Sequence, residues 1–266
     1  MAYEILVLDI DGTLTTSEKK VSERTLNAIF QIQERGHRVV LASGRPTPGI
    51  LNLAKMLKLD EYGGFILAYN GAKVLDCKSG KTIYEKTLPM ELLPELFEAA
   101  KEYKVGMLTY DTEGVIGFHV DEYIELEGRI NHLSVKSVDN LISHVDSPVN
   151  KCIMTGDGMY LAEVEKKMKE RFGDRLSIFR SEPFFLEIMP MNIDKAYSLE
   201  RLLEHLGMTK EQMISCGDGF NDLTMIQYAG MGVAMGNAQE IVKEAADYIT
   251  LTNDNDGVAH VIEKFM

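Results

Sequence analysis

The sequence has few cysteines, no long apolar run and no excess of basic residues, and each absence narrows what the protein can be. Its 266 residues include three cysteines, Cys77, Cys152 and Cys216, which are odd in number and far apart. This spacing predicts neither a disulfide framework nor a zinc knuckle, so we expect a reducing, cytoplasmic location. No run approaches the roughly 20 apolar residues that span a bilayer, and residues 1–4 lack the basic region of a signal peptide.

The charge balance excludes another group of partners. The chain carries 41 acidic and 28 basic side chains, a formal net charge of -13. This acidic excess disfavours nucleic acid and anionic membrane surfaces as partners, whereas a small phosphorylated metabolite could bind where a local site supplies positive charge. The 45% hydrophobic and 26% charged content is typical of a globular protein with a sizeable core. A monomer and a homodimer are both compatible with the sequence.

Both ends of the chain alternate short apolar runs with amphipathic stretches, which predicts an α/β fold. We expect a Rossmann-like core in which a parallel sheet has helices on both faces. The expected strands are residues 4–8, 38–42, 65–69, 213–216, 232–235 and 248–251. The expected helices lie within residues 22–36, 50–57, 195–206, 221–228, 239–246 and 257–265. Two further strands flank Ser79-Gly80, a turn signal that predicts a β-hairpin.

The alternation changes between about residues 88 and 183. The expected order there is helix, two strands, an irregular polar stretch, strand, helix and strand, and residues 121–147 show no clear pattern. We therefore predict a discontinuous core of residues 1–86 and 184–266, with an α+β cap domain of residues 87–183 inserted into it. An inserted domain attached by two crossings is suited to act as a lid.

The first chemical signal is Asp9-Ile10-Asp11-Gly12-Thr13, directly after the first strand. Ligands of open parallel sheets bind beyond the carboxyl ends of the strands, so two carboxylates should lie at the ligand edge. They can converge only if the chain turns after Asp9, which Gly12 permits, and a hard cation such as Mg²⁺ would relieve their repulsion. The alternative is a polar Asp-Gly turn at the end of a strand.

Two weaker signals could bind phosphate. Ser43-Gly44-Arg45 follows the second strand and offers a hydroxyl and main-chain N–H groups, although Ser43 or Thr47 could simply cap the next helix. Lys195 begins a helix, where the macrodipole disfavours a cation. Such a violation suggests a role toward a bound anion, and the alternative is a solvated surface lysine.

The last signal is Gly217-Asp218-Gly219-Phe220-Asn221-Asp222, again directly after an expected strand. Asp218 is placed to complete a metal site with Asp9 and Asp11, and Asn221 or Asp222 could cap the following helix instead. A capping role explains one such residue. It does not explain acids at the ends of two strands together with a serine at the end of a third.

The ordered set of Asp9, Asp11, Ser43, Lys195 and Gly217–Asp222 resembles the haloacid dehalogenase-like phosphohydrolases. The flanking segments, residues 69–72, 186–190 and 233–238, are similar to the Cof-type subgroup, which has a large α/β cap. One departure is Ala196, since the subgroup usually has glycine after the lysine. Asn237 and Asp256 lie in loops near the expected site, where a turn or cap role is as well supported as a direct one.

The resemblance implies that Asp9 is the nucleophile and that Asp11 is the general acid, and then the base that activates water. It implies Mg²⁺ held by Asp9, the main-chain carbonyl of Asp11 and Asp218, with Asp222 completing the surroundings of the metal. The phosphate-binding residues that it implies are Gly12, Ser43, Gly44, Lys195 and Asn221, and Arg45 and Asn70 are further candidates for contact with substrate.

We therefore expect a Mg²⁺-dependent phosphatase acting on small phosphomonoesters, with sugar phosphates first, through an aspartyl-phosphate. That substrate class comes from the subgroup and from no single residue. Two alternatives stay open. A phosphomutase would return the phosphoryl group to a reoriented sugar, and a phospho-acceptor signalling domain would gather similar residues around an aspartate. The inserted domain and Asp11 argue against the second alternative.

Overall fold

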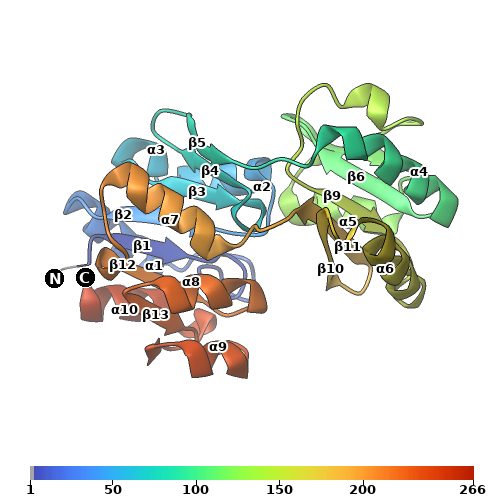
Figure 1. Ribbon diagram of the computed structural model, residues 1–266. Coiled ribbons are helices and arrows are strands. Elements are labelled where there is room, and N and C mark those ends of the chain that lie inside the picture. The colour runs from blue at the N-terminus through green and yellow to red at the C-terminus, as the bar shows by residue number, and fades with distance from the viewer. Residues whose placement is uncertain (1–2) are drawn as a thin grey trace. The chain divides into compact units, whose positions relative to one another are not determined.

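The computed structural model describes residues 3–266, which form two compact units (Figure 1). The first unit combines the chain up to Glu85 with Asp194–Met266, and the second is Lys86–Ile193. The second unit thus continues to Ile193, beyond the predicted boundary at residue 183. The reason is a strand, β11 (Phe185–Pro190), which pairs with strands of the second unit on both of its sides.

The first unit is built on an eight-stranded sheet in the order β14-β13-β12-β1-β2-β3-β4-β5. Its first six strands in that order run parallel, as the alternating pattern predicts. They are β14 (Tyr248–Ile249), β13 (Met231–Ala234), β12 (Met213–Gly217), β1 (Ile5–Leu8), β2 (Arg38–Ala42) and β3 (Phe65–Ala68). The predicted hairpin is confirmed by β4 (Lys73–Asp76) and β5 (Thr82–Glu85), which run antiparallel at the sheet edge.

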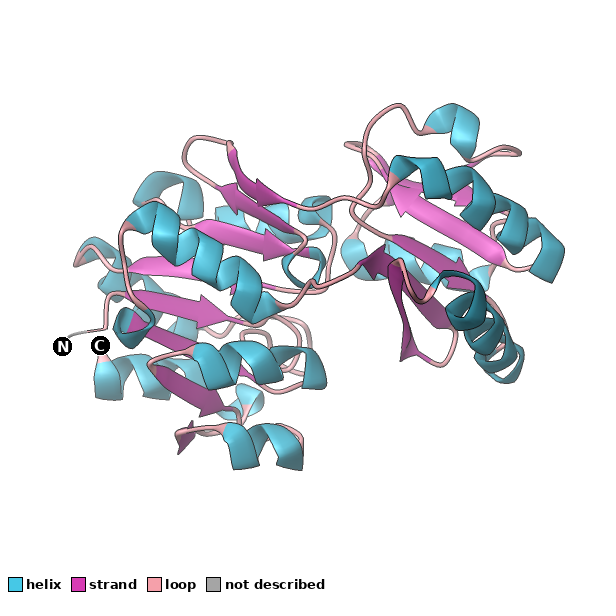
Figure 2. Ribbon diagram, viewed as in Figure 1, coloured by secondary structure: helices cyan, strands magenta, loops and turns pink. Residues whose placement is uncertain are grey.

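Helices cover both faces of this sheet (Figures 1 and 2). On one face α7 (Lys195–Leu206) and α8 (Leu223–Tyr228) pack against the alternate side chains of β1, β2 and β3. On the other face lie α1 (Glu23–Glu34), α2 (Thr47–Met56) and α10 (Gly257–Phe265). The short helices α3 (Leu59–Tyr62) and α9 (Glu240–Ala245) complete the unit. Because both faces are covered, the four residues of β1 are fully buried, as expected for a central parallel strand.

The second unit contains a six-stranded, largely antiparallel sheet in the order β10-β11-β9-β6-β7-β8. The other strands are β6 (Gly106–Tyr110), β7 (Gly114–Phe118), β8 (Ser134–Ser137), β9 (Cys152–Thr155) and β10 (Leu176–Glu182). Apolar side chains of α4 (Leu93–Tyr103) and α6 (Gly158–Phe172) form one core with this sheet. The stretch without a clear pattern contains a helix, α5 (Glu122–Asn131), and the strand β8.

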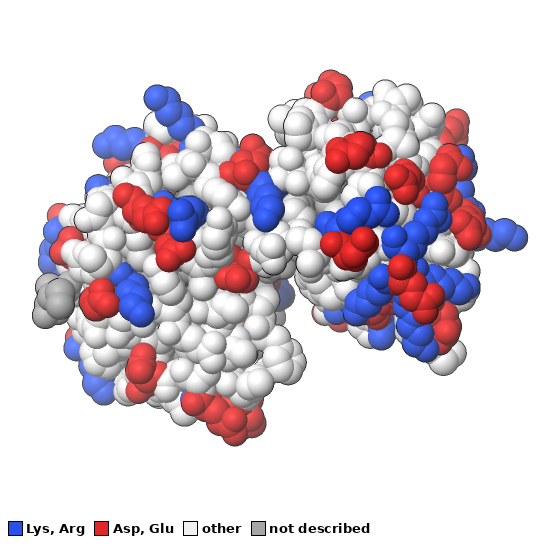
Figure 3. Space-filling model, in the orientation of Figure 1, with Lys and Arg blue, Asp and Glu red and all other residues white. Residues whose placement is uncertain are grey.

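Charged side chains of both signs alternate on the outer face of α6 (Figure 3). Lys166 pairs with Glu163, and Glu165 pairs with both Lys169 and Arg180. These ion pairs are exposed or partly exposed, so each contributes little to stability. Within residues 3–266, no helix combines the length and the apolar character needed to cross a membrane.

Candidate active site

The carboxyl ends of three neighbouring strands bring the predicted motifs together. Asp9 follows β1, Ser43 follows β2, and Asp218 follows β12. Because β1 pairs with both β2 and β12, the three segments leave the sheet side by side. The signals that lie far apart in the sequence therefore meet at one edge of the sheet, where open parallel sheets bind ligands.

Lys195 is the centre of this arrangement, and its side chain is fully buried. Its ammonium donates to the carboxylates of Asp222 at 2.6 Å and Asp9 at 2.8 Å, and to the carbonyl of Ala42 at 2.8 Å. Asp194 caps the helix that begins at Lys195 by accepting from the N–H of Tyr197. The alternative of a solvated surface lysine is therefore wrong, and Lys195 links the first and last motifs.

With both carboxylates ionised, the charges of this cluster do not cancel. Lys195 supplies one positive charge to Asp9 and Asp222, and all three side chains are at least nine-tenths buried. Burial, together with the negative charge of Asp222, raises the pKa of Asp9 to about 8, although the ammonium of Lys195 acts in the opposite direction. Burial alone would lower the pKa of Lys195, but the two carboxylates outweigh it and raise that pKa. Lys195 therefore remains a cation.

Asp218 approaches the first loop closely. Its carboxylate accepts a hydrogen bond of 2.9 Å from the hydroxyl of Thr13. Gly12 has a φ of +85° and lies so close to Asp218 that a Cβ atom there would collide with the carboxylate. The glycine is thus required both by its backbone conformation and by this contact. Burial raises the pKa of Asp218 to about 6, partly offset by the hydrogen bond from Thr13.

Asp222 uses both of its carboxylate oxygens. One accepts from Lys195, and the other accepts from the main-chain N–H groups of Asp218 and Gly219 at 2.9 Å. The predicted alternative of a helix cap is therefore partly realised, because Asp222 does close the turn that begins at Gly219. The same side chain also fixes the backbone of Asp218 and the position of Lys195.

One carboxylate oxygen each from Asp9, Asp218 and Asp222 lies within 4.8 Å of the others. These oxygens are the donor type that Mg²⁺ prefers. The pKa values of Asp9 and Asp218 are raised first by burial and further by neighbouring carboxylates, and a cation would relieve that repulsion. Among the described residues, Asp222 is the most heavily hydrogen-bonded of the three, because it accepts from Lys195 and from two N–H groups, whereas Asp9 accepts from Lys195 alone and Asp218 from Thr13 alone. The predicted division between direct ligands and Asp222 stays a prediction.

The carboxylate of Asp11 lies outside that cluster and is held by two cations. Arg45 donates to its two oxygens through Nε and Nη2, both at 2.7 Å, and Lys19 donates at 2.8 Å. Burial would raise the pKa of Asp11, but the hydrogen bonds and charges of Arg45 and Lys19 hold it below its usual value. The prediction that the main-chain carbonyl of Asp11 binds the metal stays a prediction. Lys19 had no signal in the sequence.

Ser43 and the asparagines lie around the loop that follows β2. The hydroxyl of Ser43 accepts from the N–H of Arg45 at 3.2 Å, which leaves its hydrogen for another oxygen. Neither Ser43 nor Thr47 caps α2, because the residue at that position is Pro46. The side chain of Asn221 donates to Asn70 at 3.1 Å. Asn70 also lies directly beside Gly44, where a Cβ atom would be 3.0 Å from its Oδ1.

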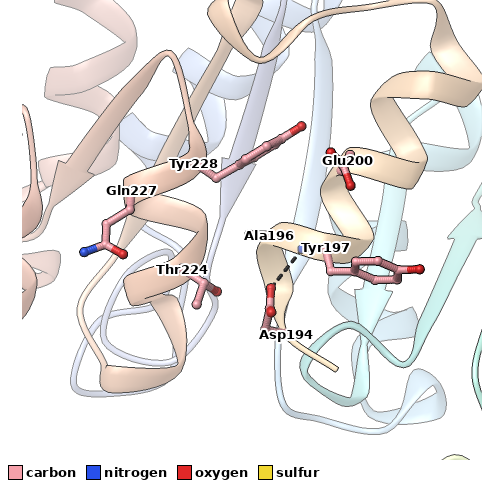
Figure 4. Close-up of a pocket in the computed structure, with 7 residues that line it drawn as sticks. All are labelled: Asp194, Ala196, Tyr197, Glu200, Thr224, Gln227 and Tyr228. Carbon is pink, nitrogen blue, oxygen red and sulfur yellow. Dashed lines mark hydrogen bonds between the residues drawn. The ribbon is translucent and has the colours of Figure 1, made fainter. Parts of the chain in front are cut away.

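A separate pocket of about 340 Å³ lies between α7 and α8 (Figure 4). Tyr197 and Tyr228 contribute aromatic walls, and Ala196 lines the pocket as well. The remaining lining residues are Asp194, Glu200, Thr224 and Gln227. This pocket contains none of the predicted site residues, so it is a surface feature beside the site. Ala196, where the subgroup usually has glycine, is thus at the pocket wall.

Comparisons with known proteins agree with these motifs. The family model of the haloacid dehalogenase-like hydrolases matches residues 6–262. A crystal structure of a haloacid dehalogenase-like hydrolase from Bacteroides thetaiotaomicron is 49% identical, with a TM-score of 0.97, and the match covers 99% of this chain and 100% of that one.

Two further relatives carry names that specify an activity. The Bacillus subtilis protein YcsE, a 5-amino-6-(5-phospho-D-ribitylamino)uracil phosphatase, is 31% identical over 269 residues, covering 99% of this chain and 96% of the relative. The structure of the sugar phosphatase BT4131 is 25% identical with a TM-score of 0.82, covering 98% of both chains. The chain belongs to the haloacid dehalogenase-like hydrolase family, and the prediction from its motifs that it is a phosphoric monoester hydrolase of the Cof-type subgroup is confirmed.

Proposed function

We propose that this enzyme hydrolyses small phosphomonoesters with Mg²⁺, through an aspartyl-phosphate on Asp9. The observation that carries the proposal is the buried cluster in which Lys195 holds Asp9 and Asp222 at 2.8 and 2.6 Å, beside Asp218. A carboxylate fixed at a strand end and flanked by a cation is suited to attack a phosphorus atom. Phosphoryl transfer needs mainly positioning and charge neutralisation, which this cluster supplies.

In the first step a carboxylate oxygen of Asp9 attacks the phosphorus atom. The bond between phosphorus and the ester oxygen breaks, and the leaving oxygen takes a proton from the carboxyl group of Asp11. Ser43, Gly12, Gly44 and Asn221 are the proposed phosphate contacts. Lys195 donates hydrogen bonds to Asp9 and Asp222. We therefore propose that it stabilises the negative charge of the phosphate electrostatically, without a direct hydrogen bond.

In the second step a water molecule attacks the phosphorus atom of the aspartyl-phosphate. Asp11, now a carboxylate, takes a proton from that water. The bond between phosphorus and the Asp9 oxygen breaks, which releases inorganic phosphate and restores the Asp9 carboxylate. Splitting one displacement into two in this way is the general advantage of covalent catalysis. The proton taken from water restores the carboxyl form of Asp11 for the next cycle. Asp11 must leave Arg45 and Lys19 and take up a proton before the first step, because these cations lower its pKa and hold it as a carboxylate.

The residues present fit a divalent cation. Asp9 and Asp218 would hold it, together with the main-chain carbonyl of Asp11, and all of these donors are oxygens. A bound Mg²⁺ supplies charge neutralisation for the phosphate oxygens. Asp222 would keep Asp218 in place through the main-chain N–H that it binds at 2.9 Å.

For the substrate we propose a sugar or sugar-alcohol phosphate. The names of two relatives support this class, one a sugar phosphatase and the other a phosphatase of a phosphoribityl compound. We assign substrate selection to the second unit, Lys86–Ile193, and the chemistry to the first. A cytoplasmic location is proposed from the three dispersed cysteines.

A phosphate-release screen tests the proposal. Purified enzyme with Mg²⁺ should release inorganic phosphate catalytically from sugar phosphates, and nucleotides and cofactor phosphates serve as comparison substrates. Phosphorylation of the protein without catalytic release of phosphate would instead indicate a phospho-acceptor domain. Isomerised sugar phosphate without phosphate release would indicate a mutase. The Asp9→Asn variant provides the blank for contaminating phosphatases.

A further inference from the structure

We propose that Asn237 and Asn253 are positioning residues that orient the peptide bond between Gly12 and Thr13 for phosphate binding. The first loop, residues 9–15, carries the proposed nucleophile and phosphate contacts, so this inference rests on the proposed function. The two asparagines come from other loops, one after β13 and one after β14. Neither is among the residues that the motifs assign a role.

Two side-chain amides hold the first loop by its carbonyl oxygens. The side chain of Asn237 donates to the carbonyl of Gly12 at 2.8 Å. Its own amide oxygen accepts from the main-chain N–H of Asn253 at 2.9 Å. The side chain of Asn253 in turn donates to the carbonyl of Thr15 at 2.9 Å. The two asparagines therefore form one connected series of hydrogen bonds, which holds the first loop at the carbonyls of Gly12 and Thr15.

These hydrogen bonds fix the orientation of the peptide bond between Gly12 and Thr13 as well as its position. A trans peptide bond is planar, and its C=O and N–H groups point in opposite directions. Because the carbonyl of Gly12 points at Asn237, the N–H of Thr13 must point away from Asn237. The hydroxyl of Thr13 simultaneously donates to Asp218. We assign this N–H to an oxygen of the substrate phosphate, since oriented main-chain N–H groups make anion sites.

The surrounding loops keep the two asparagines in register. Gly236 donates to the carbonyl of Leu251 at 3.0 Å, which ties the loop of Asn237 to that of Asn253. Asp254 accepts from both the N–H and the hydroxyl of Ser17 at 2.7 Å. The C-terminal loop is thus fastened to the chain that follows the first loop, independently of the two asparagines.

Because Asn237 is exposed, its effect on the orientation of the first loop can be measured separately from any effect on folding. Asn237 is exposed and Asn253 is half-buried, so truncating either side chain removes little packing. Surface substitutions of this kind usually change stability only slightly. A loss of phosphate affinity without a loss of stability would therefore report the orientation of the loop.

The test measures inhibition by inorganic phosphate in the intact enzyme, with p-nitrophenyl phosphate as substrate and Mg²⁺ present. Asn237→Ala should raise both the inhibition constant of phosphate and KM by about tenfold, the loss expected for one hydrogen bond. Asn253→Ala should shift both in the same direction by a smaller factor. The Mg²⁺ concentration for half-maximal activity should stay unchanged, and Tm should stay within about 3 °C of the wild type.

Asn255→Ala is the matched control. Asn255 lies in the same loop and donates to the hydroxyl of Thr252 at 2.7 Å, so its truncation should change none of these values. The inference is overturned if Asn237→Ala folds and binds phosphate as the wild type does, if it loses only kcat, or if Asn255→Ala shows the same loss. If Asn237→Ala does not fold, Asn253→Ala decides by the same criteria.

The two proposals fail in different ways. A wild-type enzyme that releases no phosphate from any ester would contradict the proposed function itself. An active wild type whose phosphate inhibition is unaffected by Asn237→Ala would contradict only the role of the asparagines.

Discussion

The ammonium of Lys195 lies 2.6 Å from Asp222 and 2.8 Å from Asp9, and the side chains of all three residues are buried. One cation therefore serves two carboxyl groups, and the cluster would carry a net negative charge if both were ionised. Burial, and then the negative charge of Asp222, disfavour a second carboxylate there, which is why the pKa of Asp9 is raised. The same imbalance favours a bound cation near Asp9 and Asp218.

Asp9→Asn should abolish turnover and leave the fold intact. The substitution keeps the shape of the side chain and removes the nucleophilic oxygen, so we expect a loss of several orders of magnitude. The fold should survive because the amide removes part of the buried negative charge beside Asp222. Phosphate release and circular dichroism check the two halves. A folded variant that retains more than about a tenth of wild-type activity, a difference of only about 1.4 kcal/mol, would show that Asp9 is not the nucleophile.

Mg²⁺ should be required for activity, and Ca²⁺ should bind but support little turnover. The donors are all oxygen, and the looser coordination of Ca²⁺ would misplace the attacking oxygen. Activity should disappear after treatment with EDTA and return with added Mg²⁺. Full activity after exhaustive chelation would remove the metal from the mechanism.

The thermal stabilisation by Mg²⁺ should grow with pH. Burial raises the pKa of Asp218 to about 6 from its ordinary 3.8, so the folded protein binds a proton more tightly than the unfolded chain. Without metal, stability should therefore fall as the pH rises between these two values. Protons compete with Mg²⁺ for the same carboxylates, so the increase in Tm should be larger at about pH 8.5 than at about pH 5.

Asp218→Asn is the control for this pH dependence. Without the titrating carboxylate, the variant should lose most of the Mg²⁺ effect on Tm at both pH values. An equal increase in Tm at both pH values in the wild type would mean that Asp218 does not hold the cation.

The second unit should determine which phosphate esters are accepted. Replacing Lys86–Ile193 by the corresponding segment of the sugar phosphatase BT4131 should move the order of kcat/KM among esters toward that of the donor. The Mg²⁺ requirement and the effect of Asp9→Asn should persist, because both belong to the first unit. A folded chimera that keeps the original substrate order would contradict this division.

The sequence was sufficient to predict the central strands, because each is a short apolar run between polar segments. β1 and β2 coincide with the expected strands to within a residue. The helix α5 was missed because its buried positions include Glu127, Gly128 and Asn131, which give no apolar period. Its polar side chains are buried through contacts with distant residues, such as the hydrogen bond from Tyr110 to Glu127. Local patterns carry no information on such contacts.

The site shows the same limit. Lys195 stood out because a cation at the start of a helix opposes the macrodipole, but its partners Asp9 and Asp222 lie 186 and 27 residues away. Nothing in the sequence indicates that Arg45 binds the carboxylate of Asp11 instead of being available to contact substrate. Side-chain partners depend on how loops leave the sheet, which residue order alone does not reveal.

The role of Asp11 can be tested through the leaving group. If Asp11 protonates the leaving oxygen, its contribution depends on how much that oxygen needs a proton. A sugar alkoxide is a poor leaving group, whereas p-nitrophenolate leaves readily. Asp11→Asn should therefore reduce kcat/KM far more for a sugar phosphate than for p-nitrophenyl phosphate. The difference could approach about 10²–10⁴-fold, the usual size of general acid catalysis.

The comparison must use kcat/KM, because kcat also reports hydrolysis of the aspartyl-phosphate. That step needs Asp11 as a base and should slow equally for both substrates, so we expect a burst of p-nitrophenolate followed by slow turnover. The amide side chain of the Asp11→Asn variant should keep one hydrogen bond to Arg45 or Lys19, because its oxygen can still accept from one of them. The variant should therefore fold as the wild type does. Equal losses of kcat/KM for the two substrates, with chemistry limiting, would mean that Asp11 does not donate the proton. The proton would then have to come from water or a neighbouring group, and Asp11 would serve to hold Arg45 and Lys19.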